Sequence, residues 1–214
     1  MDINLKSATA AFLRAFLAGV SIGIGGTVYL SCDNRYVGSF LFAIGLFLIF
    51  SYGLNLFTGK VGYALENQPS YILFLVIVWF GNLAGTFFVA KALTFTRVFP
   101  NIGEKALTLC EAKIADNPLS ILILAFFCGL MMYLAADGYK KSDNVLRKYL
   151  SVFLPVMIFI LSGFEHCIAN MFYYSLCDFF GAKELMYLLV MTAGNTLGSF
   201  LFPAVHILLS KTDK

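Results

Sequence analysis

Six long apolar stretches, separated by short polar segments, run along this chain of 214 residues. Each stretch has the roughly 20 mostly apolar residues that a helix needs to cross the hydrocarbon core of a bilayer. The pattern therefore predicts an all-α membrane protein with six transmembrane helices in a single domain, residues 1–214. The six stretches are residues 8–30, 36–59, 67–90, 117–136, 149–177 and 185–210.

The fifth stretch differs from the others because a Glu-His pair interrupts it. Glu165 and His166 lie near the middle of residues 149–177, which are more than a simple membrane helix needs. Ionisable groups at bilayer depth are costly, because lipid offers no water to solvate them. We therefore expect His166 to face a polar path through the protein and to take part in moving a substrate.

The two halves of the chain share a sequence motif. The third and sixth stretches both contain Gly-Asn-x-x-Gly-[Ser/Thr]-Phe, which begins at Gly81 and again 113 positions later at Gly194. A weaker echo, offset by 110 positions, relates the first and fourth stretches. Small residues at such positions allow membrane helices to cross closely. We interpret Asn82 and Asn195 as structural residues near the pathway that tie helices or loops together by hydrogen bonds.

The shared motif divides the chain into two repeats of three helices. We place the first repeat at residues 8–95, a linker at 96–116 and the second repeat at 117–211. Because each repeat has an odd number of spans, the two copies must be inverted relative to each other. Polar, glycine-containing interruptions at 53–60 and 162–166 fall in corresponding helices, so we expect helices 2 and 5 to be broken. This plan predicts a transport site near the bilayer midplane.

Composition agrees with a protein that lives in lipid. Hydrophobic residues make up 60% of the chain and charged residues 13%, whereas about a quarter of a soluble domain is charged. The chain has no basic patch of the kind that nucleic acid requires. Its five cysteines are scattered and lack the spacing of a zinc site. We expect membrane lipid, and not nucleic acid, as a partner.

The distribution of Lys and Arg predicts the orientation of the chain. Six crossings place both termini on one side of the membrane. That side collects nine Lys and Arg residues and the opposite side six. The positive-inside rule therefore predicts a multi-pass protein of the cell (inner) membrane with both termini in the cytoplasm. We interpret the basic residues between positions 140 and 148 as topological signals.

Two segments resemble a known family. Residues 163–170, Gly-Phe-Glu-His-Cys-Ile-Ala-Asn, are similar to the fifth-helix signature of the formate/nitrite transporter family. Residues 56–59, Leu-Phe-Thr-Gly, are similar to the loop in that family's interrupted second helix. The Gly-Asn motifs match as well, so the resemblance covers nearly the whole chain.

The resemblance implies a fold, an assembly and a class of substrate. The expected fold is aquaporin-like with six spans, assembled as a homopentamer with one pore in each protomer. The expected substrates are small monovalent anions such as formate, nitrite or hydrosulfide. Neither a metal nor an organic cofactor is implied.

The resemblance also carries over to individual positions. His166 matches the central pore histidine, Thr58 the threonine that hydrogen-bonds it, and Lys113 the lysine of a vestibule. The apolar residues that narrow the pore on either side of the histidine are matched by Phe42, Leu46, Leu56 and Phe159. We interpret Glu165 and Asn170 as structural residues beside the pore.

These residues lead to a hypothesis for transport. The anion is drawn in near Lys113, meets the apolar ring and crosses as, or nearly as, the neutral acid. The proton comes from His166 or through water. Because imidazole titrates near physiological pH, we expect transport that depends on pH and is linked to protons.

Three other functions compete with this hypothesis. An aquaporin-like channel for neutral small solutes predicts Asn-Pro-Ala boxes at both broken helices, but the chain has only Asn-Pro-Leu at residues 117–119. An intramembrane enzyme would need a nucleophile or metal beside Glu165 and His166, and none is marked, so we predict that the protein is not an enzyme. A proton-coupled secondary carrier of short carboxylates stays open.

Overall fold

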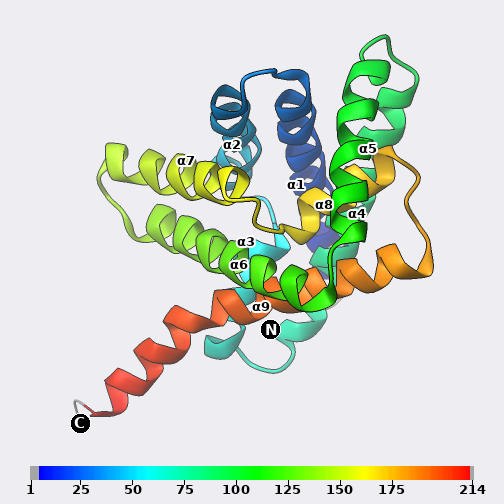
Figure 1. The fold of residues 1–214 in the computed structure, drawn as a ribbon. Helices are drawn as coiled ribbons and strands as arrows, with labels where there is room; N and C mark the ends of the chain where they lie inside the picture. The colour runs from blue at the N-terminus through cyan, green and yellow to red at the C-terminus, as the bar shows by residue number, and fades with distance from the viewer. Residues whose placement is uncertain (1–4, 213–214) are drawn as a thin grey trace.

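The structure is a computed structural model that describes residues 5–212, and within this range it contains helices and no strand. Figure 1 shows the helices packed around the short segments α3 and α8, which lie inside the molecule, while the C-terminal part of α9 extends away from it. The elements are α1 (Leu5–Ser31), α2 (Arg35–Ser51), α3 (Phe57–Lys60), the 3-10 segment η1 (Val61–Glu66), α4 (Tyr71–Thr94), α5 (Phe99–Ala115), α6 (Pro118–Lys141), α7 (Val145–Leu161), α8 (Cys167–Leu176) and α9 (Ala182–Thr212).

The predicted all-α class is confirmed by this architecture. Within the described residues, four helices are long and apolar enough to cross a membrane unaided, namely α1, α4, α6 and α9. The predicted second stretch comprises α2 and α3 with non-helical residues 52–56 between them. The predicted fifth stretch comprises α7 and α8, which residues 162–166 separate.

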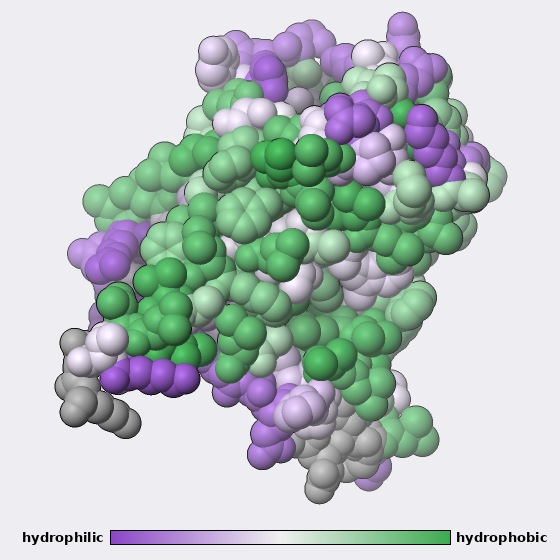
Figure 2. Space-filling view, turned by 60° about the horizontal axis from the view of Figure 1, so that its bottom comes forward, coloured by the Kyte–Doolittle hydropathy of each residue, from purple (hydrophilic) through white to green (hydrophobic). Residues whose placement is uncertain are grey.

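The surface of the protein is largely apolar. Large hydrophobic side chains such as Leu13, Phe80 and Leu154 are exposed. Figure 2 shows apolar residues covering the middle of one face, with hydrophilic residues gathered toward its upper and lower margins. Water-soluble monomers rarely expose an apolar surface of this extent. The surface therefore suits contact with lipid or with neighbouring subunits.

Glycines allow two pairs of helices to pack with their backbones in contact. A Cβ atom at Gly85 in α4 would overlap the carbonyl oxygen of Phe16 in α1. In the same way, a Cβ atom at Gly198 in α9 would overlap the carbonyl oxygen of Phe126 in α6. Gly85 and Gly198 occupy the same place in the repeated Gly-Asn-x-x-Gly motif. The motif therefore marks a close helix crossing in each half of the chain.

We expect Gly198→Ala to destabilise the fold, because neither helix backbone at this crossing can move without disturbing its neighbours. Forcing an extra methyl group into a well-packed interior costs about 1–3 kcal/mol. The thermal midpoint of the detergent-purified protein, followed by size-exclusion chromatography after heating, should fall clearly. Gly59→Ala is the matched control, because Gly59 is also buried but a Cβ there makes only ordinary contacts of 3.6 Å or more. Equal midpoints for the two variants would contradict this explanation.

Asparagine side chains fix the starts of α2 and α7 in equivalent ways. The Asn34 side chain accepts hydrogen bonds from the backbone N–H groups of Tyr36 and Val37. The Asn144 side chain, 110 positions later, accepts one from the N–H of Arg147 at 2.9 Å. Such caps satisfy N–H groups that have no partner inside the helix. They define where each of these helices begins before it runs inward toward its break.

Candidate functional site

Two interruptions of helical structure form the centre of the site. Residues 52–56 separate α2 from α3, and residues 162–166 separate α7 from α8. The second residue of each interruption is a glycine at positive φ, Gly53 at 60° and Gly163 at 70°. A side chain at this φ is strained even though there is open space around both positions. The two glycines, offset by 110 positions, let the chain turn back before the next helical segment begins.

Asn82 of α4 ties down the first interruption with three hydrogen bonds. Its Oδ1 accepts from the backbone N–H of Phe57 at 2.9 Å. Its Nδ2 donates to the carbonyl oxygens of Ala15 and Asn55, each at 2.8 Å. The side chain is fully buried. It therefore joins α1, α4 and the start of α3 at one point.

Asn195 of α9 does the same for the second interruption. Its Oδ1 accepts from the N–H of Cys167 at 2.9 Å. Its Nδ2 donates to the carbonyl oxygens of Ala125 and Glu165, each at 2.8 Å. All three partners lie 110 positions after those of the first asparagine. The two halves of the chain thus use one hydrogen-bond arrangement to hold their interruptions.

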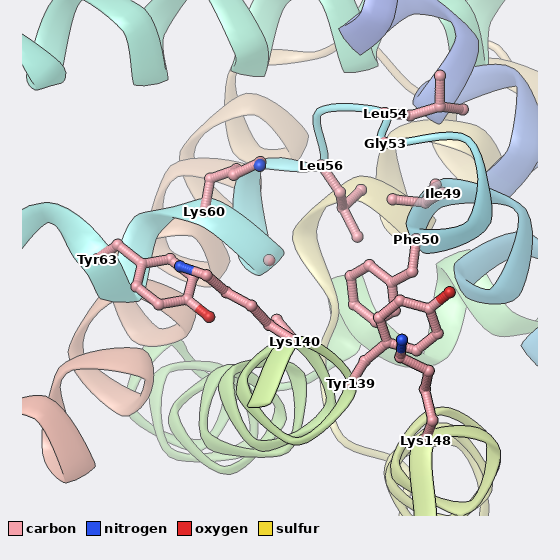
Figure 3. A pocket seen from close by; sticks show the side chains of 12 residues that line it. Ile49, Phe50, Gly53, Leu54, Leu56, Lys60, Tyr63, Tyr139, Lys140 and Lys148 are labelled. Carbon is pink, nitrogen blue, oxygen red and sulfur yellow. The ribbon is translucent and has the colours of Figure 1, made fainter. Parts of the chain in front are cut away.

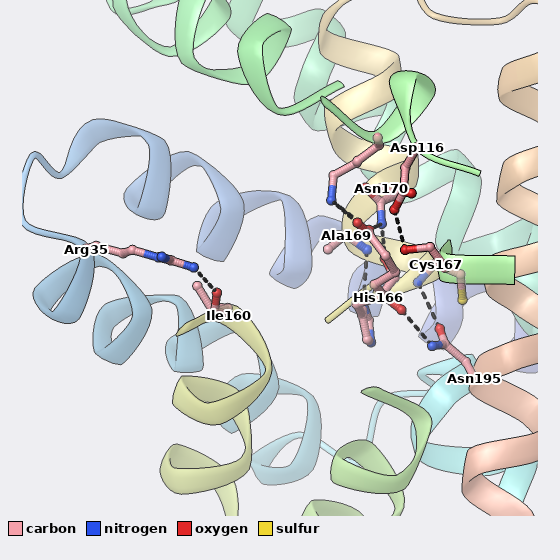
Figure 4. A network of polar contacts seen from close by, with 11 residues as sticks. Arg35, Asp116, Ile160, His166, Cys167, Ala169, Asn170 and Asn195 are labelled. Carbon is pink, nitrogen blue, oxygen red and sulfur yellow. Dashed lines mark hydrogen bonds and ion pairs between the residues drawn. The ribbon is translucent and has the colours of Figure 1, made fainter. Parts of the chain in front are cut away.

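His166 occupies the N-cap position of α8, and its hydrogen bonds define its tautomer. The backbone N–H of Ala169 donates to Nδ1 at 3.0 Å, as Figure 4 shows. Since Nδ1 is an acceptor, a neutral ring carries its proton on Nε2. Nε2 lies 2.8 Å from Oγ1 of Thr58 in α3, so it donates to that hydroxyl. Both side chains are almost fully buried, at 2% and 1% exposure.

Aromatic and aliphatic side chains surround this pair. The ring of Phe159 stacks on the imidazole of His166 with 5.6 Å between centroids. Phe42 meets Phe159 edge to face, with 5.8 Å between centroids. Leu46 and Leu56 are buried as well, and Leu56 is the N-cap residue of α3. The N-cap position that holds a histidine in one half therefore holds a leucine in the other.

A buried ion pair lies next to the histidine. The ammonium of Lys113, in the last turn of α5, contacts both carboxylate oxygens of Glu165 at 2.8 and 2.6 Å. The exposed fractions of the two side chains are 14% and 6%. Asn170 of α8 donates to Glu165 at 2.8 Å and to the carbonyl oxygen of His166 at 3.0 Å. Lys113 is therefore a paired cation attached to the turn that carries the histidine.

The structure brings most of the predicted site residues into two groups. His166, Thr58, Phe159 and Phe42 form a chain of direct contacts, and Lys113, Glu165 and Asn170 form the adjoining polar network. Leu46 and Leu56 belong to the same buried core. Asn82 and Asn195 contact the backbone of the two interruptions and not the imidazole.

Two further residues of the site escaped the sequence analysis. The side chain of Arg35, at the start of α2, donates to the carbonyl oxygen of Ile160 at 3.0 Å (Figure 4) and to that of Leu161 at 2.9 Å. These carbonyls end α7, so the guanidinium offsets the negative end of that helix. Asn55 occupies the position that Glu165 has in the second half. The repeat offset of 110 would have identified Asn55, but no pattern pointed to Arg35.

The described part of the chain offers no group of three or more His, Cys, Asp and Glu side chains placed to hold a metal ion. The chemistry available at the centre is a neutral imidazole, a hydroxyl and an apolar wall. Such a set can donate a hydrogen bond or exchange a proton with a small polar species.

Comparison with known proteins identifies relatives of the chain. A family model described as Formate/nitrite transporter matches residues 2–209. Formate channel FocB of Escherichia coli (strain K12) is 29% identical over 78% of this chain and 66% of its own length. Formate channel FocA of Haemophilus influenzae is 25% identical over 76% of this chain and 64% of its own length. The chain thus spans about two thirds of the length of these relatives.

One solved structure resembles the whole chain. It is described as a pentameric formate channel with formate bound, and it superposes with a TM-score of 0.81 at 25% sequence identity. The match covers 97% of this chain and 98% of the solved one. The arrangement of helices described above is therefore that of a known channel structure.

Proposed function

Because the chain belongs to the formate/nitrite transporter family, we propose that it is a membrane channel for formate and other small monovalent weak-acid anions, including nitrite and hydrosulfide. Membership of this family and four apolar helices of spanning length make it an integral membrane protein. The observation that carries the proposal is the buried His166–Thr58 hydrogen bond between the two interruptions.

The His166–Thr58 pair suits a pathway for a species that can exist as an anion or as a neutral acid. A bare anion in an apolar interior carries a large desolvation penalty. Phe159 and Phe42 offer no hydrogen bonds, so they favour a species that has lost its charge. Nε2–H of His166 is the donor closest to this apolar wall. An anion that reaches it can accept a hydrogen bond from Nε2–H in place of the Thr58 hydroxyl and take up its proton from water.

The hydrogen bond from Ala169 to Nδ1 limits how the histidine can act. Protonating Nδ1 would break this N-cap interaction, so a lasting imidazolium is disfavoured by the fold itself. We therefore assign to His166 the role of a neutral hydrogen-bond donor through Nε2, and the proton that neutralises the anion comes through water. The positive end of α8, which begins beside the ring, favours the anion while this exchange takes place.

The same proposal includes six crossings, a homopentamer and cytoplasmic termini in the inner membrane. The divided helices α2–α3 and α7–α8 serve as the second and fifth crossings. A large apolar groove of about 1010 Å³, bordered by α4 and α9, suits coverage by a neighbouring subunit, as expected for a pentamer. The excess of Lys and Arg on the side of the termini supports the orientation.

Flux through proteoliposomes tests the proposal. We expect rapid, non-saturable flux of formate and measurable flux of nitrite or hydrosulfide. Each of these fluxes should rise as the pH is lowered. Each anion is assayed side by side at two pH values against protein-free liposomes. Passage of water or glycerol without any anion flux would overturn the assignment. Slow, saturable and strictly proton-coupled flux would instead identify a carrier.

A further inference from the structure

A second cavity, of about 320 Å³, lies beside the proposed pathway. Figure 3 shows that α3, α6 and α7 contribute Lys60, Lys140 and Lys148 to its lining. The cavity also borders Leu56 and Gly59, which flank the segment that carries Thr58. It therefore lies next to the segment that carries Thr58, on the face that the Lys and Arg distribution assigns to the cytoplasm.

The three lysines bring positive charge without a compensating carboxylate. No Asp or Glu lines the cavity. Lys140 lies over the ring of Tyr63, with 4.7 Å to the centroid, and Lys148 lies over the ring of Tyr139 at 4.8 Å. Within residues 5–212, none of the three ammonium groups forms an ion pair. The ring contacts position Lys140 and Lys148, and none of the three ammonium groups is neutralised by a direct ion pair.

Several lysines outside the cavity form ion pairs with acidic side chains, in contrast to the three that line it. Lys91, Lys105 and Lys113 pair with Asp178, Asp33 and Glu165 respectively. Lys141, next to Lys140 in sequence, pairs with Asp137 at 2.9 Å and does not line the cavity. The sequence thus provides acidic partners for lysines elsewhere and leaves the cavity without one.

A tyrosine adds a neutral donor to the same lining. The hydroxyl of Tyr63 is buried and has no hydrogen-bond partner within the described part of the chain. Buried hydroxyl groups are normally hydrogen-bonded, and the buried Oδ1 of Asp137 is also unpaired, so the Tyr63 O–H is free to donate to a bound ligand. Three ammonium groups and this O–H are all donors. Their complement is an oxyanion with several acceptor oxygens and more than one negative charge.

We propose that this cavity binds a soluble divalent oxyanion of the phosphate type, which obstructs the adjacent mouth of the pathway. A monovalent anion would balance only one of the three like charges, whereas a phosphate dianion can accept from several lysines at once. Lysine is an established type of phosphate ligand because its ammonium acts as a compact charge. A bound dianion would lie against Leu56 and Gly59 and impede small anions there. The obstruction, but not the binding, rests on the proposed function.

Direct binding of radiolabelled inorganic phosphate tests the site without any transport assay. The full-length assembly is placed in nanodiscs of neutral phosphatidylcholine and titrated by scintillation proximity. We expect saturable binding that Lys140→Gln and Lys148→Gln each weaken about tenfold, the size of one charge-assisted hydrogen bond. Lys141→Gln is the matched control and should bind like the wild type. Absent or non-saturable binding, or equal loss in Lys141→Gln, would overturn the proposal.

A second arm separates the soluble anion from a lipid headgroup. If phosphate binds with the same affinity in nanodiscs that contain phosphatidylglycerol as in neutral ones, the cavity takes its ligand from the aqueous phase. Loss of phosphate binding in those nanodiscs would mean that a lipid headgroup occupies the cavity, which overturns the soluble ligand.

A third arm adds phosphate to formate flux assays. We expect phosphate to inhibit formate flux through the wild type but not through the Lys140→Gln, Lys148→Gln double variant. If phosphate still inhibits flux through the double variant, obstruction at the cavity is contradicted. Phosphate binding without formate flux would reject the proposed function alone. Formate flux without saturable phosphate binding would reject this inference alone.

Discussion

Replacing His166 by phenylalanine is expected to abolish the pH dependence of formate flux and to lower the flux itself by roughly tenfold or more, the equivalent of one hydrogen bond to a charged species. The phenyl ring keeps the stacking surface that Phe159 needs. It removes the only ring N–H in the His166–Thr58 pair and the acceptor that caps α8. Only the Thr58 hydroxyl then remains as a donor beside the apolar wall, so an anion that reaches it is bound less well and takes up a proton less readily.

The measurement is formate uptake into proteoliposomes at two pH values, with equal amounts of folded protein verified by size-exclusion chromatography. His206→Phe is the matched control, because His206 is the second of two histidines and lies exposed near the end of α9. It should retain the wild-type pH response. Thr58→Val removes the hydroxyl partner but keeps the imidazole. Its formate flux and pH response should lie between those of His166→Phe and His206→Phe. A His166→Phe variant with unchanged, pH-dependent flux would remove the histidine from the mechanism.

The sequence pointed to the centre of the candidate site because a Glu-His pair is unusual at bilayer depth. A Glu-His pair in an apolar stretch is costly unless it has a function, and the segment around it carried the family resemblance. The structural role of Asn82 and Asn195 could also be predicted, because a buried amide in a glycine-rich helix normally forms hydrogen bonds between helices. The structure adds which carbonyls and N–H groups they bind, and these depend on how three helices meet.

Other features could not be predicted because they depend on packing between distant segments. Lys113 and Glu165 are separated by 52 positions, and nothing in either neighbourhood indicates that they form an ion pair. Arg35 reaches the end of α7 only because α2 and α7 lie side by side. Two lysines of the second cavity, Lys140 and Lys148, were interpreted as topological signals. That interpretation gives their side of the membrane and says nothing of the cavity they share.

Breaking the Lys113–Glu165 pair is expected to produce the second large effect, this time on stability. Removing one partner of a buried ion pair leaves an uncompensated charge and costs about 3–5 kcal/mol. Lys113→Met leaves the Glu165 carboxylate with Asn170 as its remaining side-chain donor. Glu165→Gln keeps the shape of that side chain but leaves the ammonium without a counter-charge. Both single variants should therefore lower the apparent free energy of unfolding in mixed-micelle denaturant titrations.

The double variant decides whether the cost comes from the unpaired charge. Lys113→Met combined with Glu165→Gln buries no net charge, so it should lose much less stability than the two single variants added together. Lys105→Met is the matched control, because its pair with Asp33 is largely exposed, and such pairs contribute little. Single variants that are no less stable than Lys105→Met would show that the pair does not hold the turn. Lys113 would then be free to act as a cation that attracts anions, and the turn carrying His166 would have to be held by Asn170 and Asn195.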